Sequence, residues 1–304
     1  MAKSMMLALA ATLGLALPEC AMAKEEIVLT PSSPWVVDFS EDRCAIIRQF
    51  GEGDETLYLR ISQYMPASSL ELVLMGDNAR LPFDNRLGGA RNHPLSVSFG
   101  PEAGISAVTD AIQAEAGETH AIIATQLSFM PEQTEEAGLD PDRGFMDEAQ
   151  RSALRQMDRI EIGGSITQSH VLMTGPMGDV FKVLDDCTYD LVEHLGLDAT
   201  ASRNRLSKPV IDEAASLIIR RGMQTTYPAA RSSRGQMAIL RVRLIVETDG
   251  KVGDCLVIET TNTDGFGQGV CDRFRADGRY TPAIGYDGKP LRSWDIVTIR
   301  YLAR

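Results

Sequence analysis

Four histidines and one polar loop are the parts of this sequence best suited to catalysis. The histidines occur singly and none belongs to a metal-binding spacing such as H-E-x-x-H; they are His93, His120, His170 and His194. The loop MGDNARLPFDNRLGGARNHP brings acids, cations and an imidazole together, namely Asp77, Asp84, Arg86, Arg91 and His93. A small-molecule site in this loop is one hypothesis, and a solvated loop of turn-forming Asn and Gly is the alternative that we favour. We therefore predict no catalytic residue, cofactor or metal site, and no enzyme.

The cysteines favour disulfide bonds over metal binding. Cys20 lies in an apolar leader, which leaves Cys44, Cys187, Cys255 and Cys271 for the rest of the chain. An even number in an exported protein is typical of disulfides, and the close C-x-x-C spacing of a structural zinc site is missing. Four cysteines allow three pairings, between which the sequence alone does not choose. We pair Cys255 with Cys271, which are close in the chain and share one predicted domain, and Cys44 with Cys187.

The first residues have the pattern of a secretory signal peptide. Lys3 supplies a positive charge, and an apolar run of 13 residues, 5–17, follows it. The motif AMA then places small residues before a cleavage site between Ala23 and Lys24. We therefore expect export to the periplasm and a mature chain that begins at Lys24.

Two alternatives to a cleaved signal peptide remain. The first is an uncleaved membrane anchor, but the apolar run is short for a bilayer span and is interrupted by Pro18 and Glu19. The second is a lipid attached to Cys20, which is disfavoured because Glu19 occupies the position where lipid-attachment signals have a small residue. No later segment has a long apolar stretch, so we expect a mature protein that is soluble.

Length and charge limit the classes of function. The chain has 304 residues, which favours two domains, and 44% hydrophobic with 24% charged residues is typical of a globular protein. Its formal net charge is −12, and it contains no basic run. A nucleic-acid-binding protein needs a basic surface, and so does a protein that docks on anionic lipid. Both classes are therefore disfavoured.

The first half of the chain has the pattern of β-strands. Leu57, Leu59 and Ile61 alternate with polar residues after the turn cluster GEGDE, which predicts a hairpin. The segments SSLELVLMGD, HPLSVSFG and THAIIATQLSF predict three further strands. An acidic segment rich in turn residues, PEQTEEAGLDPDRG, predicts a surface loop.

Two helices are expected to complete the N-terminal domain. They are FMDEAQRSALRQMDRI, residues 145–160, and MGDVFKVLDDCTYDLVEHLG, residues 177–196, which Gly196 is expected to end. The spacing predicts one buried face on the second helix, made of Val180, Val183, Leu184, Cys187, Leu191 and Leu195. A polar segment without periodicity follows and predicts a linker at residues 199–208.

The last third predicts a small α+β domain. An amphipathic helix, VIDEAASLIIRRGM, precedes two strands joined at Asp249 and Gly250, because a D-G pair is a strong hairpin signal. A short helix in DGFGQGVCDRFRAD, a second D-G turn and a final strand in RSWDIVTIRYLAR follow. The predicted organisation is α+β throughout. A signal peptide at 1–23 precedes a mainly-β domain with two helices at 24–198, a linker at 199–208 and a small domain at 209–304.

The last quarter of the chain resembles the TonB C-terminal domain family. The matching residues stand in the family's order: Tyr227, Pro228, Gly235, Asp249, Gly250, Pro282, Ala283, Asp287, Gly288 and Pro290. Each match is weak alone, but their order and spacing together are specific. The N-terminal domain loosely resembles a type that accompanies such domains in exported bacterial proteins and has no known function.

The resemblance implies recognition of a protein or peptide partner, including an outer-membrane protein, in a Gram-negative periplasm. Such recognition can proceed by addition of an extended peptide to an exposed strand or through the face of the sheet. In the final strand one face is expected to bind the partner and consists of Trp294, Ile296, Thr298 and Arg300. Val297, Ile299 and Tyr301 are expected to face the core. The alternative is a final strand that is internal to its sheet and already paired.

Energy-transducing members of this family differ from this sequence in two respects. They keep an uncleaved N-terminal membrane helix and a long proline-rich arm, and this sequence has a cleavable leader and a folded domain instead. We therefore predict an exported protein-binding module linked to outer-membrane transport. A membrane-anchored energy transducer is the first alternative, and an enzyme that uses the loop from Asp77 to His93 is the second.

Overall fold

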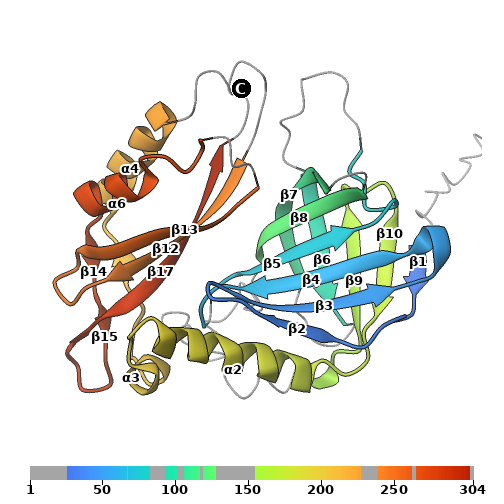
Figure 1. Cartoon of the computed structure of the whole chain (residues 1–304), viewed down its shortest axis with the longest axis horizontal. Helices are drawn as coiled ribbons and strands as arrows, with labels where there is room; N and C mark the ends of the chain where they lie inside the picture. The colour runs from blue at the N-terminus through green and yellow to red at the C-terminus, as the bar shows by residue number, and fades with distance from the viewer. Residues whose placement is uncertain are drawn as a thin grey trace, which may run out of the picture.

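A computed structural model describes residues 26–66, 68–82, 93–100, 106–116, 119–127, 155–226, 238–261 and 265–301. The fold is α+β, with two separate hydrophobic cores (Figure 1). The first core draws on residues between Ile27 and Leu191, in the N-terminal domain. The second draws on residues between Ile211 and Tyr301, in the C-terminal domain.

Ten strands form one curved sheet in the N-terminal domain. Along the sheet they follow the order β1-β10-β9-β6-β7-β8-β5-β4-β3-β2. Their bounds are β1 Glu26–Leu29, β2 Val36–Phe39, β3 Cys44–Phe50, β4 Leu57–Gln63, β5 Leu70–Met75, β6 His93–Phe99, β7 Ser106–Ala116, β8 Thr119–Leu127, β9 Arg159–Gly164 and β10 Ser169–Met173. All neighbouring pairs are antiparallel except β1 and β10, which are parallel.

The two ends of this sheet are joined by the segment that follows β1. Pro31 forms a bridge with Phe50 at the end of β3, and the Gly51 N–H donates a hydrogen bond to the Thr30 carbonyl at 2.9 Å. Arg48 on β3 also connects the two ends of the sheet, because its guanidinium donates to the Thr174 carbonyl after β10 at 2.7 Å. The sheet therefore curls around its own interior as a barrel does.

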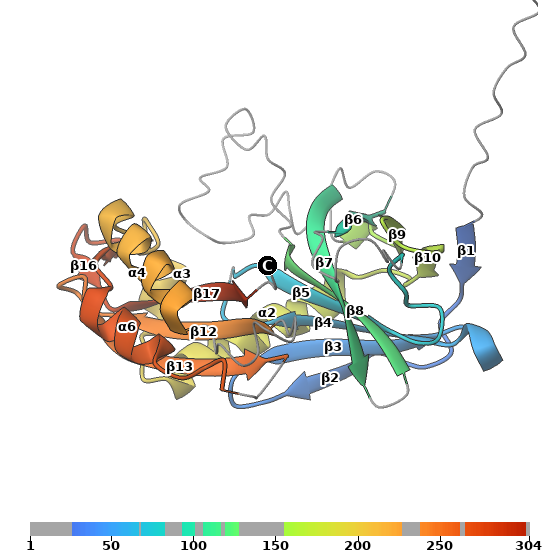
Figure 2. The ribbon, with the colours of Figure 1, turned by 90° about the horizontal axis from the view of Figure 1, so that it is seen from above.

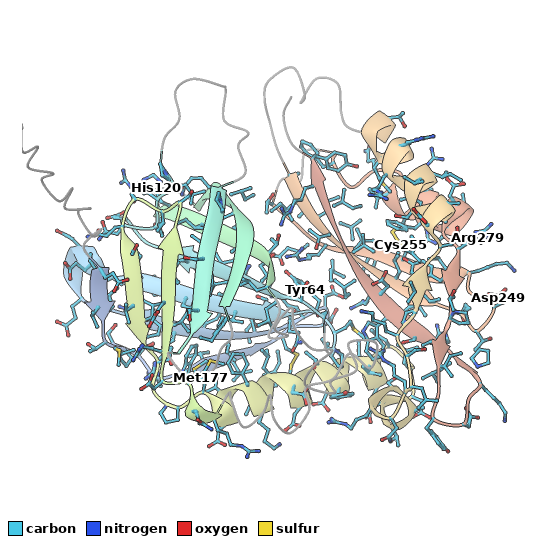
Figure 3. All side chains as sticks on the ribbon, turned by 180° about the vertical axis from the view of Figure 1, so that it is seen from behind. Tyr64, His120, Met177, Asp249, Cys255 and Arg279 are labelled. Carbon is cyan, nitrogen blue, oxygen red and sulfur yellow. A yellow bond between two sulfur atoms is a disulfide. The ribbon has the colours of Figure 1, made fainter. Side chains whose placement is uncertain are left out.

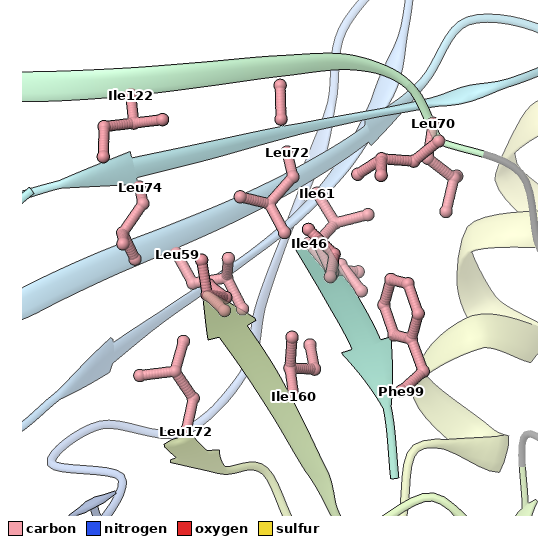
Figure 4. Close-up of a cluster of buried hydrophobic side chains, with 14 of the residues drawn as sticks. Ile46, Leu59, Ile61, Leu70, Leu72, Leu74, Phe99, Ile122, Ile160 and Leu172 are labelled. Atoms are coloured by element: carbon pink, nitrogen blue, oxygen red, sulfur yellow. The ribbon is translucent and has the colours of Figure 1, made fainter. Parts of the chain in front are cut away.

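The interior of the curled sheet is filled with aliphatic and aromatic side chains. Strand periodicity places them there, because alternate residues of each strand point to the same side. Figure 4 shows this cluster, in which Ile46, Leu59, Ile61, Leu70, Leu72, Leu74, Phe99, Ile122, Ile160 and Leu172 converge from seven strands. The interior is thus a packed core.

Helix α2, Gly178–His194, closes this core from one side. Phe181, Leu184, Cys187 and Leu191 join the core cluster, and a disulfide joins Cys187 to Cys44 on β3. Gly196 follows the helix with φ of 67°, the left-handed conformation typical of a residue that ends a helix. Val183, which was expected on the buried face, is 39% exposed, so that expectation is wrong.

The C-terminal domain is built on a three-stranded antiparallel sheet of order β13-β12-β17. These strands are β12 Ala238–Val246, β13 Val252–Thr260 and β17 Ser293–Tyr301. The helices are α4 Glu213–Thr226 and α6 Val270–Asp277, and the short strands are β11 Val210–Ile211, β14 Tyr280–Thr281, β15 Ala283–Ile284 and β16 Pro290–Leu291. The helices cover one face of the sheet, and the N-terminal domain lies on the other side (Figures 1 and 2).

Several expected elements are present and others differ. The hairpin at GEGDE, with the 3-10 turn η1 at Gly53–Glu55, and the hairpin at Asp249–Gly250 are confirmed. The helix expected at 145–160 falls mostly outside the described residues, and its last two residues belong to β9 instead. The expected linker contains a helix, α3 Ala199–Arg203, which the Asp198 side chain caps. No described helix is both long enough and apolar enough to span a membrane.

Candidate partner-binding site

The final strand, β17, lies at one edge of the C-terminal sheet. It pairs with β12 along its whole length, from Ser293 opposite Val246 to Tyr301 opposite Ala238. No other strand in the described part of the chain pairs with it. The outer side of β17 is therefore an edge where an additional strand could form hydrogen bonds.

The opposite edge of the same sheet, β13, is occupied by side chains. The Cys255 amide donates to the Asp254 carboxylate at 2.8 Å, and the Cys255 carbonyl accepts from the Arg275 guanidinium of α6 at 3.2 Å. A disulfide between Cys255 and Cys271 holds α6 against the strand. Main-chain groups bonded in this way are not available to an incoming strand. On β17 the Ile296 amide likewise bonds to a neighbouring carboxylate, that of Asp295. The two edges still differ, because only β13 has a carbonyl bonded to α6 and a disulfide to that helix.

The two faces of β17 have separate roles. Val297, Ile299 and Tyr301 pack with the core beneath α4 and α6, which confirms the expected core-facing set. Tyr301 also contacts the Met223 sulfur of α4 at 3.8 Å. The alternate residues therefore lie on the opposite face.

The face expected to bind a partner lies against the N-terminal domain of the same chain. Trp294 is 4% exposed and packs with Met65, Tyr189, Val192, Leu197 and Ile245, and Ile296 borders this cluster. Arg300 donates a hydrogen bond to Thr125 on β8. Thr298 accepts from Arg241. The expectation that this face meets an external partner is wrong for Trp294, which is buried against the N-terminal domain. Ile296, Thr298 and Arg300 stay partly exposed, and their contact with a partner stays a prediction.

A buried polar cluster connects the two domains beside this face. Arg241 of β12 donates to the Glu71 carboxylate of β5 at 3.1 Å, and Arg60 of β4 bonds to both Glu71 and Glu259 of β13 at 3.2 Å. The Tyr64 hydroxyl donates to Glu71 and Glu259, and Figure 3 shows Tyr64 between the two domains. We call these five residues the latch.

Burial dominates the titration of the latch. It raises the pKa of the Glu71 carboxyl above its ordinary value, aided by Glu259 and opposed by Arg241 and Arg60. Burial likewise raises the pKa of the Tyr64 hydroxyl, and the neighbouring carboxylates add to this effect. Burial alone would lower the pKa of Arg60, but Glu259 and Glu71 outweigh it and raise that pKa. The arginine stays charged and the tyrosine stays neutral.

A second group of contacts extends the latch toward β3. Arg243 of β12 donates to Asp42 at 2.9 Å, and Arg43 lies 3.5 Å from the Glu259 carboxylate. Arg43 also pairs with Asp38 on β2 at 3.3 Å. Charges therefore cross the domain boundary in both directions, with arginines and acids contributed by each side.

Sequence reasoning missed the latch, although the sequence contains a signal for it. Arg241 and Arg243 stand inside AILRVRLIV, and Glu71 stands inside LELVL. Both segments are otherwise apolar strands, and a charged residue within one is buried only when it is paired. The side chain that pairs with it, however, comes from a different domain and has no sequence relation to it.

The loop considered for catalysis is only partly described. Asp77 is exposed, Asp84, Arg86 and Arg91 lie outside the described residues, and His93 is the first residue of β6. The other histidines lie apart, with His120 on β8, His170 buried on β10 and His194 in the last turn of α2. Within the described ranges no three His, Cys, Asp or Glu residues are grouped as a metal site would require.

The residues that carry the family resemblance lie in turns and short strands where they are described. Gly250 has φ of 79°, and a Cβ there would lie 2.1 Å from the Tyr280 carbonyl oxygen, so this turn requires glycine. Asp287 accepts from the Lys289 amide at 3.0 Å in the turn that contains Gly288. The remaining motif residues are Pro282, between β14 and β15, Ala283 in β15 and Pro290 in β16. Tyr227, Pro228 and Gly235, and the expected cleavage site at Ala23 and Lys24, lie outside the described residues.

Comparison with known proteins adds no relative. No model of a known protein family matches this chain, and neither does any curated protein.

Proposed function

We propose that this protein is an exported, TonB-like binding module that captures an extended segment of a partner protein on the outer edge of β17. The observation that carries the proposal is the inequality of the two sheet edges. β13 has a carbonyl bonded to Arg275 and a disulfide to α6, whereas β17 pairs only with β12 among the described strands and has its Ile296 amide bonded to Asp295. The edge of β17 is the more open one for an incoming strand.

Strand addition also suits the surroundings of β17. The face toward α4 and α6 is filled by the core, and the other face is covered by the N-terminal domain. Much of both faces is therefore taken by contacts within the chain, and the main-chain edge is left for recognition. Main-chain hydrogen bonds would supply affinity, and the side chains of alternate residues would set the register. Of the two binding modes that the family resemblance implies, this arrangement favours the edge.

The compartment follows from the disulfides and the leader. Two disulfides are typical of a protein that folds in an oxidising compartment. Together with the signal-peptide pattern, they support a periplasmic location, where the partner class includes outer-membrane proteins with extended segments.

A pair of proline variants tests the edge. Consecutive residues of a strand direct their N–H groups to opposite sides, so Val297→Pro and Thr298→Pro remove one outward N–H and one bond to β12. Linear peptides selected from a phage-displayed random library on the wild-type protein would serve as the ligand. We expect one variant to remain as stable as wild type and lose peptide binding, and the other to lose stability. Full binding by every folded member of the pair would contradict the proposal.

A further inference from the structure

The interface between the two domains changes in character along the C-terminal sheet. At one end Ile245 lies opposite Trp294 in the β12–β17 register, and both belong to an apolar cluster. Arg241 lies four residues before Ile245 on β12 and opposite Thr298 on β17. The contacts at this position are polar and charged. One face of one small sheet thus has an apolar end and a charged end.

The apolar end adjoins the covalent connection between the domains. Tyr189 and Leu197, from α2 and the residues after it, pack in the same cluster as Trp294. The chain then passes through α3 to Arg205, whose guanidinium stacks over the Trp294 ring at 4.6 Å and bonds to Ser293 at 3.1 Å. Contacts at this end are fixed both by apolar packing and by the chain itself. This end is the natural axis of a hinge, because hinges lie near the termini of elements.

The charged end lies away from this connection and holds the domains together by the latch. The cross-domain contacts at the charged end join Arg241 with Glu71, Arg60 with Glu259, Tyr64 with Glu259, Arg243 with Asp42 and Arg300 with Thr125. Buried ion pairs of this kind gain little net free energy, because desolvation offsets their attraction. Contacts of this composition can therefore be exchanged for water at a smaller free-energy cost than an apolar core of equal size.

Several buried donors at the charged end have no hydrogen-bond partner among the described residues. They are Arg43 Nε, Arg60 Nε, Ser62 Oγ and Arg243 Nη1. A buried donor without a partner disfavours the arrangement that buries it. Separation of the domains at this end would let water satisfy all four donors. These donors therefore favour an arrangement in which the charged end meets water.

We propose that the two domains form a latched hinge, which opens at the charged end and pivots on the apolar cluster around Trp294. In the closed state the N-terminal domain covers the face of β12 and β17. In the open state Arg241, Arg243, Ile296, Thr298 and Arg300 face solvent. The N-terminal domain thereby acts as a cover for a second face of the C-terminal sheet. This inference does not rest on strand addition, which concerns the edge of β17.

Distance measurement between spin labels tests the hinge in the full chain. Labels at Glu52→Cys and Arg221→Cys place one exposed nitroxide on each domain, and neither residue belongs to the latch. The latch variant is Arg241→Met, which leaves the Glu71 carboxylate in the closed interface beside Glu259 without its arginine. The matched control is Lys182→Met, which removes the cation of an exposed ion pair within α2. Pulsed electron–electron distance distributions are recorded for all three proteins.

We expect only short distances between the two labels in the protein with the unmodified latch and in the control. In the latch variant we expect an additional population with long distances. A distribution that does not change in the folded latch variant would overturn the proposal. Should that variant fail to fold, Asp42→Asn takes its place, because it leaves the buried Arg243 without its acid while Asp42 itself is 39% exposed and its loss is better tolerated. An unchanged distribution in this second variant would overturn the proposal equally. Peptide binding at β17 can fail independently of either result.

Discussion

The Arg241 guanidinium lies 3.1 Å from the Glu71 carboxylate, and these two side chains are only 2% and 5% exposed although they belong to different domains. A charge pair so deeply buried is tolerated because further groups satisfy it. Arg241 also donates to Thr298, and Glu71 also accepts from Tyr64 and Arg60. The stability of the whole chain therefore depends on contacts that neither domain has alone.

Replacing one partner of this pair should lower the free energy of unfolding more than replacing both partners does. Arg241→Met leaves Glu71 buried beside Glu259, and we expect a loss of about 3–5 kcal/mol in the free energy of unfolding. Arg241→Met combined with Glu71→Gln leaves no uncompensated charge in the pair and should recover most of that loss. Urea denaturation of the two single variants and the double variant completes a double-mutant cycle. If the double variant loses as much free energy of unfolding as the two single variants together, Arg241 and Glu71 do not interact as proposed.

Stability should fall with rising pH in the range where Glu71 ionises. Its pKa in the folded chain is raised by burial and by Glu259, while Tyr64, Arg60 and Arg241 face it with opposing effects. A raised carboxyl pKa means that the folded state binds the proton more tightly, so the contribution is largest at low pH. It is lost as pH rises from the ordinary value of 4.5 to the raised one.

The difference in the free energy of unfolding between wild type and Glu71→Gln isolates this contribution, because the amide does not titrate. We expect the stability of the wild type relative to the variant to decrease as pH rises through this window. Denaturant titrations at successive pH values from acid to neutral measure it. A difference that grows with pH would mean that Arg241 and Arg60 lower the pKa of Glu71 instead.

The two disulfides should contribute unequally to stability. The bond between Cys255 and Cys271 spans 16 residues, and the one between Cys44 and Cys187 spans 143. In the chain-entropy account a short loop gives about 3 kcal/mol and a loop beyond 100 residues about 5 kcal/mol. Replacement of each pair by serines, followed by thermal unfolding, compares them. An equal loss from both pairs would show that strain or residual structure outweighs loop entropy.

Two glycines in D-G turns provide a matched test of the β12–β13 turn. Gly250 and Gly288 both have positive φ, at 79° and 76°, so alanine is strained at either position. A Cβ at Gly250 would meet the Tyr280 carbonyl oxygen at 2.1 Å, whereas one at Gly288 meets nothing within 4 Å. We expect about 1–2 kcal/mol of destabilisation for Gly288→Ala from backbone strain, and clearly more for Gly250→Ala. Similar values for both variants would mean that the turn shifts to accept the methyl group.

The mass of the exported protein tests the leader and the redox state together. We expect a chain that begins at Lys24 and takes up four alkyl groups only after reduction, because four cysteines remain in two disulfides. Intact mass spectrometry before and after reduction and alkylation measures both properties. A full-length chain found in the inner membrane would favour the membrane-anchored transducer over a free periplasmic binder.

Local patterns in the sequence predicted local structure well. Alternation at Leu57, Leu59 and Ile61 places β4 correctly because burial on one side of a strand repeats every second residue. The Asp249–Gly250 turn follows from backbone geometry that only glycine adopts at low cost. Both cysteine pairs are present as expected, since the shorter pair is local and leaves only one partner for each remaining cysteine.

Contacts between distant segments were not predictable in the same way. The segment SAVTDAIQAEA gives β7, but its alanines and acids carry no strand signal. On β17 the alternation separates two faces correctly, yet it does not say what covers each face. Trp294 and Ile296 have the composition of a binding surface and of a domain interface alike, and the structure uses them as a domain interface.

The parallel pairing of β1 with β10 has a consequence for the order of folding during synthesis. Glu26 is opposite Ser169, so the first described strand gains its partner only after a strand near the end of its domain has been made. The disulfide between Cys44 and Cys187 can form only after an even later segment, the one that contains Cys187, has been made. The β12–β13 hairpin, in contrast, joins neighbouring stretches of chain. Contacts of long sequence separation form slowly, so the part of the protein that is synthesised first is expected to reach its native state late.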